Sequence, residues 1–170
     1  MEFYTERLHI RPFLTGDQAQ MLDLLTDDTV KQTYILPDYP DREAAKPLFD
    51  RLLDLSQDDC RYVSAITLDG VCIGLVNDTE ITGDSIEMGY AILPRYHNRG
   101  YCTEMLRGVI DYLHRHGFSK VLTAAFESNL ASLRVMEKCG MVRLAETEEL
   151  TYRGKTHRCI YYCAERKESV

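Results

Sequence analysis

The chain has 170 residues, of which 45% are apolar and 28% are charged, with ten glycines and five prolines. This length suits one folded domain with its own core, and the composition excludes a disordered or collagen-like protein. Acidic residues outnumber basic ones by 27 to 20, giving a net charge of -7, and no long basic run interrupts them. A nucleic-acid partner is therefore not expected, since phosphate neutralisation needs clustered positive charge.

Targeting and membrane signals are missing from the sequence. The opening residues, MEFYTERLHI, are charged early, and no apolar run reaches the roughly 18 residues that a membrane span needs. We therefore expect a cytoplasmic protein with no membrane partner, folded as a single domain over residues 1–170.

Cysteine and histidine spacing argues against disulfides and metals. The six cysteines lie scattered in apolar patterns without a C-x-x-C, and the five histidines form no zinc-binding pattern. We expect buried free thiols, because cysteine in such patterns behaves as a small apolar residue, and we expect no metal site.

The first predicted elements are a strand and two helices. Residues 7–13 alternate apolar and polar side chains, as a strand does. Thr15 and Gln18 have the spacing of a capping box, and the apolar residues that follow recur at helical intervals: Ala19, Leu22 and Leu25. A second helix is expected over residues 44–56, with Pro47 in its first turn because a proline deeper inside costs about 3 kcal/mol.

Three strands follow in the middle of the chain. Residues 61–68 and 71–78 flank the dipeptide Asp69-Gly70, which is suited to a tight hairpin turn, and so form an antiparallel pair. A third strand is expected over residues 85–93, where Pro94 ends it.

The last third of the chain alternates helices and strands. A helix from about Arg99 to Gly117 has a regular apolar face: Met105, Leu106, Val109, Ile110 and Leu113. A strand over 120–126, a helix ending at Gly140 and two long strands around Arg153-Gly154 close the chain. The order predicts a mixed α/β sheet with helices packed on it and a strand-helix-strand unit at its centre.

Residues 92–103 carry the clearest chemical signal. They form a strand end, a short turn and a helix start, an arrangement that gathers free backbone N–H groups and partial positive charge at an anion site. Gly100 lets an anion approach the backbone, while Arg95 and Arg99 add full charges. The alternative is that Gly100 only relieves a tight turn and the arginines are solvated. Neither a P-loop nor a dinucleotide-binding G-x-G-x-x-G occurs.

Four segments, in the right order, resemble the GNAT acetyltransferases. EMGYAILPRYHNRGYCTEML is similar to their acetyl-CoA segment, which contains Q/R-x-x-G-x-G/A, and SNLASLRVMEKCGM is similar to their N-x-x-S helix. TERLHIRPF and YRGKTHRCIYYC resemble the branch that contains the ribosomal-protein N-terminal (Rim-type) acetyltransferases. The resemblance implies the GNAT fold, with a mostly antiparallel sheet of six to seven strands, a splayed central strand pair and flanking helices.

The resemblance also implies roles for particular residues. Backbone amides of the turn would hold the pyrophosphate of acetyl-CoA, and the Ile92 N–H would polarise the thioester carbonyl. Asn129 would hold the pantetheine arm or the leaving sulfur, although it is equally suited to cap a helix. The implied acetyl-CoA-binding residues are Ile92, Leu93, Arg95, His97, Asn98, Arg99, Gly100, Tyr101, Cys102, Thr103 and Asn129.

Three positions depart from the family pattern. His97 stands at the Q/R position and Cys102 at the last G/A position. Met136 stands where many members carry a tyrosine that protonates the leaving thiolate. Ser132, one helical turn earlier, is the substitute acid that the resemblance offers, and its alternative is an exposed helix serine.

Glu87 is the candidate general base. It precedes Ile92 on the same predicted strand and matches a glutamate that the family often uses, directly or through water. Its alternative is an inert strand carboxylate, and a regular strand would put it and Ile92 on opposite faces unless a bulge intervenes. Tyr34 and Tyr39 lie in the segment where the family builds its acceptor wall.

The expected function is transfer of acetyl from acetyl-CoA to a primary amine by direct attack in a ternary complex. The acceptor is a protein N-terminal α-amino group or a small-molecule amine, and the protein is a monomer or a homodimer. The alternative is a non-catalytic acyl-CoA-binding or regulatory module of the same fold, which the three departures leave open.

Overall fold

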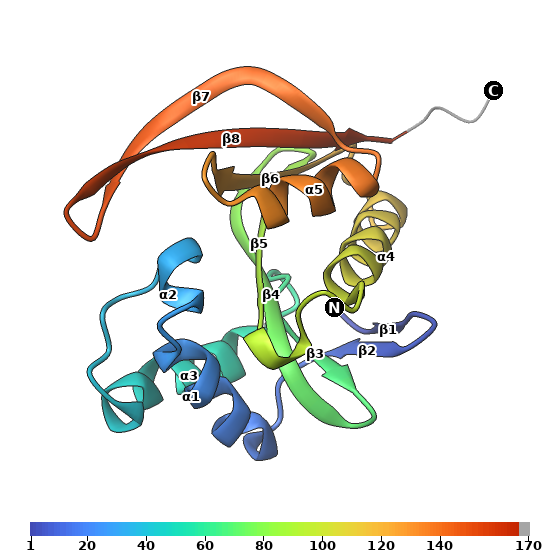
Figure 1. Ribbon diagram of the computed structural model, residues 1–170. Helices are drawn as coiled ribbons and strands as arrows, with labels where there is room; N and C mark the ends of the chain where they lie inside the picture. Colours follow the sequence, from blue (N-terminus) through green and yellow to red (C-terminus); the bar gives the residue numbers. More distant parts are fainter. Residues whose placement is uncertain (167–170) are drawn as a thin grey trace. The chain divides into compact units, whose positions relative to one another are not determined.

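The structure is a computed structural model that describes residues 1–166. Within that range it has a mixed, mostly antiparallel sheet of eight strands in the order β1-β2-β3-β4-β5-β6-β8-β7 (Figure 1). The strands are β1 (Phe3–Tyr4), β2 (Leu8–Arg11), β3 (Ser64–Leu68), β4 (Val71–Thr82), β5 (Ser85–Ile92), β6 (Lys120–Phe126), β7 (Val142–Tyr152) and β8 (Lys155–Glu165). The helices are α1 (Gln18–Thr26), α2 (Val30–Thr33), α3 (Arg42–Ser56), α4 (Tyr101–Arg115) and α5 (Leu130–Lys138), with 3-10 turns η1 (Thr15–Asp17) and η2 (Pro94–Tyr96).

The predicted α/β class is confirmed, and the expected six to seven strands are too few. Strand β1 was not predicted, because two residues cannot show an alternation. Phe3 pairs with Ile10 and Tyr4 with His9, so β1 extends the sheet antiparallel to β2. The short helix α2 was also not predicted, since four residues complete only one turn.

The chain forms two compact units. The first unit comprises Met1–Asp78 and Tyr90–Met105, and the second unit comprises Thr79–Gly89 and Leu106–Val170. That residues 1–170 act as one domain stays a prediction.

The first unit has its core between α1, α3 and the strands β2 to β4. The rings of Phe13 and Phe49 meet edge to face, with centroids 6.1 Å apart and an interplanar angle of 82°. Helices α1, α2 and α3 lie together in Figure 1. The β3–β4 hairpin turns at Asp69 and Gly70 with φ angles of 49° and 80°, which confirms the predicted tight turn.

The start of α1 differs from the prediction. Thr15 and Gln18 form no capping box, because the segment before α1 is the turn η1, in which the Asp17 carboxylate accepts from the Leu14 N–H at 2.9 Å. Ala19 is exposed, and the buried face of α1 is Met21, Leu22, Leu24 and Leu25.

Pro47 lies deeper in α3 than predicted. The Asp41 side chain caps this helix by accepting from the Ala44 N–H at 2.9 Å, so the helix begins at Arg42. Pro47 is therefore in the second turn, where its missing N–H cannot bond the carbonyl of Glu43.

The second unit is built on β6, β7 and β8. Strand β8 pairs antiparallel with both neighbours, and β7 and β8 form the long hairpin seen in Figure 1. The parallel pairing of β5 with β6 is short, joining Ser85, Ile86 and Glu87 to Lys120, Val121 and Leu122. By contrast, β6 pairs with β8 from Lys120 to Phe126. Strand β6 thus continues beyond its parallel pairing, as a splayed strand pair requires.

The cysteines are free thiols, as predicted, but only some of them are buried. Cys72, Cys159 and Cys163 are buried, whereas Cys60 is exposed in the turn after α3. Within residues 1–166, no helix has both the length and the apolar character needed to cross a membrane.

A close approach between β4 and β5 occurs at Gly74. A Cβ atom built on Gly74 would lie 2.3 Å from the carbonyl oxygen of Ala91 and 3.0 Å from the Cα of Ile92. Both contacts are with backbone, which cannot move aside as a flexible side chain does. Only glycine fits here, and its lack of a side chain determines how closely β4 packs against the end of β5.

We predict that Gly74→Ala lowers the free energy of unfolding by about 2 kcal/mol, as overpacking against a fixed backbone does. Urea unfolding measures this change. Gly16→Ala is the matched control, because a Cβ there meets no atom within 4 Å. Equal stability of the two variants would contradict the close approach.

Candidate active site

The end of β5 presents the backbone of Ile92 away from β4. The Leu93 N–H donates to the Ile73 carbonyl of β4 at 2.9 Å, and the Ala91 carbonyl also faces β4, at Gly74. Neighbouring residues of a strand direct their N–H and C=O groups to opposite edges. The N–H of Ile92, the predicted thioester donor, therefore points to the edge that β4 does not occupy.

The turn after β5 has an unusual backbone. The short turn η2 is followed by Asn98 and Gly100, whose φ angles are 59° and 82°, and α4 then begins at Tyr101. Positive φ at Gly100 favours glycine, and a Cβ there would meet only the Arg7 Nη2 atom, at 3.4 Å. The positive φ fits both interpretations of Gly100, a relieved turn and an anion site, and anion binding stays a prediction.

Backbone amides are available in this turn. Within the described part of the chain, the N–H groups of Asn98, Arg99, Gly100 and Tyr101 donate no hydrogen bond. They lie at the N-terminal end of α4, where unpaired amides and the helix dipole concentrate partial positive charge.

His97 links the turn to the strand. Its Nε2 atom lies 2.7 Å from the Ile92 carbonyl oxygen, and its backbone N–H donates to the Pro94 carbonyl at 3.0 Å. Because the carbonyl can only accept, Nε2 carries the hydrogen in this contact. The family-atypical histidine thus joins the turn to the residue whose N–H is the predicted thioester donor.

The arginines of the turn differ in their surroundings. Arg95 lies over the Tyr96 ring, 5.2 Å from its centroid, and 3.9 Å from an Asp23 carboxylate oxygen, so part of its charge is already balanced. Arg99 is exposed, and its carbonyl accepts from Arg7. Cys102 and Thr103 lie in the first turn of α4, as predicted.

In the second unit, Asn129 and Ser132 form a hydrogen-bonded pair at the start of α5. Asn129 caps the helix by accepting from the Ser132 N–H at 3.3 Å, and its Nδ2 donates to the Ser132 hydroxyl oxygen at 3.2 Å. Ser132 is half-buried rather than an exposed helix serine. Met136, one turn later, is 1% exposed and belongs to the core.

Glu87 lies among other acidic groups of the second unit. Burial raises the pKa of Glu87, and the charges of Glu80 and Glu148 raise it further, while Thr79 acts in the opposite direction. The Tyr161 hydroxyl donates to Glu148 at 2.8 Å, and burial together with this bond raises the pKa of Tyr161. Tyr161 therefore remains a protonated donor at neutral pH.

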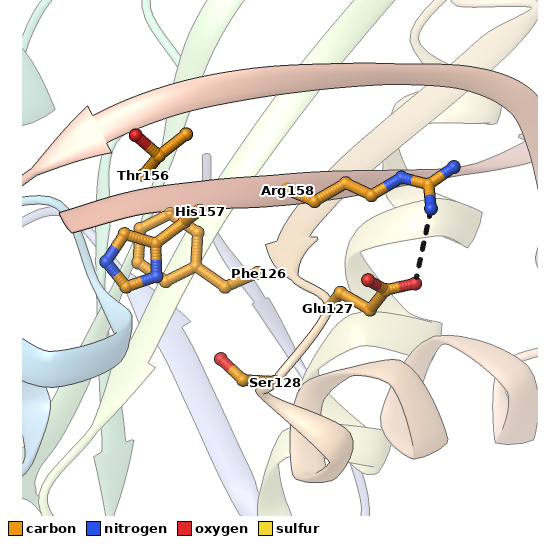
Figure 2. A pocket seen from close by; sticks show the side chains of 6 residues that line it. All are labelled: Phe126, Glu127, Ser128, Thr156, His157 and Arg158. Atoms are coloured by element: carbon orange, nitrogen blue, oxygen red, sulfur yellow. Dashed lines mark ion pairs between the residues drawn. The ribbon is translucent and has the colours of Figure 1, made fainter.

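A pocket opens between the end of β6 and the start of β8, next to Ser128 (Figure 2). The His157 ring stacks on Phe126 with centroids 4.2 Å apart. Arg158 extends toward Glu127, with a nitrogen-oxygen distance of 3.8 Å. Ser128 immediately precedes Asn129 in the chain, so this pocket lies directly before the α5 cap.

Tyr34, proposed for the acceptor wall, is held by β4. Its hydroxyl donates to the Asn77 side chain at 2.5 Å, and burial raises the pKa of this tyrosine. Tyr39 is half-buried against the core of the first unit. Both side chains fix the segment around them, and a role in acceptor selection stays a prediction.

Sequence reasoning missed Thr5, Arg7 and Glu104, which contact one another beside the turn. The TERL segment resembles the family, but the resemblance implies no role for it. The available signal was Glu104, an acidic residue in the first turn of α4 that requires a positively charged partner beside a phosphate site. The separation of Glu104 and Arg7 along the chain conceals their pairing.

Comparison with known proteins identifies the class. Residues 7–142 match the acetyltransferase (GNAT) domain. The chain therefore belongs to the GNAT acetyltransferase family and is an acetyl-CoA-dependent acetyltransferase, as the resemblance implied.

The relatives include a protein similar in sequence and solved structures similar in fold. The uncharacterized N-acetyltransferase YnaD of Bacillus subtilis (strain 168) is 27% identical over 146 residues, covering 84% of each chain. RimL, a ribosomal L7/L12 alpha-N-protein acetyltransferase in complex with coenzyme A, has a TM-score of 0.84 at 16% identity, covering 97% of this chain and 98% of that one. Spermidine N-acetyltransferase from Vibrio cholerae, in complex with CoA and spermine, has a TM-score of 0.78 at 18% identity, covering 94% and 95%.

We predict that Glu87→Gln stabilises the fold at neutral pH. The raised pKa means that the folded state holds this proton more tightly than the unfolded state, so the stability contributed by Glu87 is full below its ordinary pKa of 4.5 and is lost as pH rises through the folded value. The variant should therefore melt higher than the wild type at pH 7.5, and the difference should shrink toward pH 4. Glu6→Gln, at an exposed position, is the control. A difference in Tm that does not change with pH would contradict the raised pKa.

Proposed function

We propose that this acetyltransferase moves the acetyl group of acetyl-CoA to a primary amine by direct attack in a ternary complex. The observation that carries the proposal is the turn over residues 93–101, where four amides have no hydrogen-bond partner among residues 1–166. They lie at the start of the helix α4 and follow the strand that presents the Ile92 N–H. Such a turn suits a pyrophosphate without a lysine, because the amides and the helix dipole supply the positive charge.

The residues assigned to acetyl-CoA are those of the turn and its flanks. The amides of residues 98–101 hold the pyrophosphate, and Gly100 keeps the approach free of a Cβ. The Ile92 N–H donates to the thioester oxygen, where negative charge develops during attack, and one such donor is commonly worth about 3 kcal/mol.

Protonation of the leaving sulfur is assigned to Ser132. Because the Asn129 Nδ2 donates to the Ser132 oxygen, the serine hydrogen is free to point elsewhere. When the amine attacks the carbonyl carbon and the C–S bond breaks, the thiolate takes the Ser132 proton, and Ser132 takes a proton back from solvent water. Met136 cannot do this, since a thioether carries no proton.

Glu87 is assigned as the general base. An amine attacks a thioester only when neutral, and a free lysine amine has a pKa of about 10.4. Glu87 accepts the proton that the attacking nitrogen loses, and its raised pKa brings its basicity closer to a neutral working pH.

The acceptor is a protein N-terminal α-amino group or a small-molecule amine. A ribosomal-protein α-amino acetyltransferase and a spermidine acetyltransferase both share this fold, which supports either class. We assign acceptor contacts to the pocket of Phe126, Ser128 and His157, because it lies immediately before the proposed thiolate site in the chain. A cytoplasmic location and a monomeric or homodimeric state stay predictions.

We predict that Glu87→Gln lowers kcat more than tenfold and leaves the Kd for acetyl-CoA within about twofold of wild type, since a lost base affects the chemical step alone. A steady-state activity assay measures kcat, and a calorimetric titration measures the Kd for acetyl-CoA. An unchanged kcat would remove Glu87 from the mechanism.

Wild-type protein should bind acetyl-CoA in a calorimetric titration and release free CoA thiol when suitable amines are added. The panel contains N-terminal peptides, lysine peptides and polyamines.

A second function, a non-catalytic acyl-CoA-binding module, is favoured by the buried Met136 at the usual tyrosine position. Binding without thiol release on every acceptor would support that module, and no binding would overturn both functions.

A further inference from the structure

Arg7 makes an unusual number of contacts for a side chain that is 42% exposed. Its Nε atom donates to the Glu104 Oε2 atom at 2.7 Å, and its Nη2 atom lies 2.6 Å from the same oxygen. Its Nη1 atom donates to the Arg99 carbonyl at 3.0 Å, and its guanidinium lies 4.6 Å from the centroid of the Tyr101 ring. One side chain from the segment before β2 thus contacts the turn on both sides of Gly100.

The other Glu104 oxygen is also occupied. Its Oε1 atom accepts from the Thr5 hydroxyl at 2.6 Å and from the Arg7 backbone N–H at 2.7 Å. Burial pushes the pKa of Glu104 up, but these bonds and the Arg7 charge outweigh it and hold that pKa below its ordinary value. Glu104 is therefore a carboxylate at neutral pH, with both oxygens directed to residues 5 and 7.

This network fixes the geometry of the turn. Through its bond to the Arg99 carbonyl, Arg7 orients the peptide before Gly100. Its contact with the Tyr101 ring orients the first residue of α4, and its ion pair with Glu104 orients the first helical turn. The planar guanidinium can make all of these contacts together because its donors are arranged in a rigid fork, which a lysine ammonium lacks.

The network also balances charge. Glu104 lies in the first turn of α4, where a carboxylate favours the helix but repels an approaching phosphate. Arg7 neutralises that carboxylate and adds a cation next to Gly100, since its Nη2 atom is the group closest to the position of a Gly100 Cβ.

We propose that Arg7, held by Glu104 and Thr5, is a positioning residue for the pyrophosphate-binding turn. It acts through the Arg99 carbonyl and Glu104 to keep the amides of residues 98–101 directed at the phosphates. The proposal rests on the proposed function of this turn and adds to it a part for the TERL segment.

The test compares a thioester that has the pyrophosphate with one that lacks it. Arg7→Ala should lower kcat/KM for acetyl-CoA at least tenfold, through KM, and change kcat/KM for acetyl-pantetheine less than twofold. The same variant should weaken binding of CoA at least tenfold by calorimetry, a readout that does not depend on turnover. Arg7→Lys should lower kcat/KM for acetyl-CoA and CoA binding nearly as much as Arg7→Ala, because lysine keeps the charge but lacks the planar fork of donors.

Arg11→Ala is the matched control. Arg11 makes a comparable fork with Asp17, at 2.7 and 2.9 Å, in the same unit, and its hydrogen bonds go to Pro12 and Asp17 rather than to the turn. Its loss should lower Tm and leave the ratio of the two kcat/KM values as in the wild type.

Glu104→Gln provides a second variant if Arg7→Ala folds poorly, since it keeps the side-chain shape and removes the ion pair. It should lower the ratio of kcat/KM for acetyl-CoA to kcat/KM for acetyl-pantetheine, as Arg7→Ala does. If the ratio and CoA binding stay at wild-type values in folded Arg7 or Glu104 variants, the positioning role is overturned. If the wild type itself neither binds CoA nor uses acetyl-CoA, the proposed function fails instead.

Discussion

The close approach of β4 to the end of β5 at Gly74 is the constraint on which the geometry of the proposed thioester donor depends. Because Gly74 has no side chain, the Ala91 carbonyl can face β4, and the Leu93 N–H can bond Ile73. Strand geometry then leaves the N–H and C=O of Ile92 on the opposite edge. His97 hydrogen-bonds that carbonyl, and the N–H is the group of Ile92 that is proposed to meet the thioester.

Charge in the first unit is arranged locally around the proposed anion site, in a chain of net charge -7. On this proposal the partial charges of backbone amides and the dipole of α4 attract the anion, while the two carboxylates Glu104 and Asp23 are paired, Glu104 with Arg7 and Asp23 with Arg42 and Arg95. Pairing confines each carboxylate's repulsion to its immediate surroundings. A protein can thus keep an acidic surface, which suits cationic acceptors, and still bind a polyanionic co-substrate.

Local signals in the sequence predicted the local structure well. The Asp69-Gly70 hairpin, the strand at residues 120–126 and the buried face of α4 follow from patterns of a few residues, and all are confirmed. The capping of α1 and the place of Pro47 were wrong, because Asp17 and Asp41 competed successfully as the capping residues. The Arg7–Glu104 fork could not be predicted, since nothing in the neighbourhood of either residue specifies a partner so distant in sequence.

Asn129 can serve both as a helix cap and in the proposed chemistry at the leaving sulfur. Its Oδ1 atom caps α5, as the structural reading requires, while its Nδ2 atom donates to the Ser132 hydroxyl. The cap fixes the amide plane, and the fixed amide determines which lone pair of the serine is used. On the proposed mechanism, the serine hydrogen is then directed by a helix cap, so that the stability of α5 and the supply of the proton depend on the same side chain.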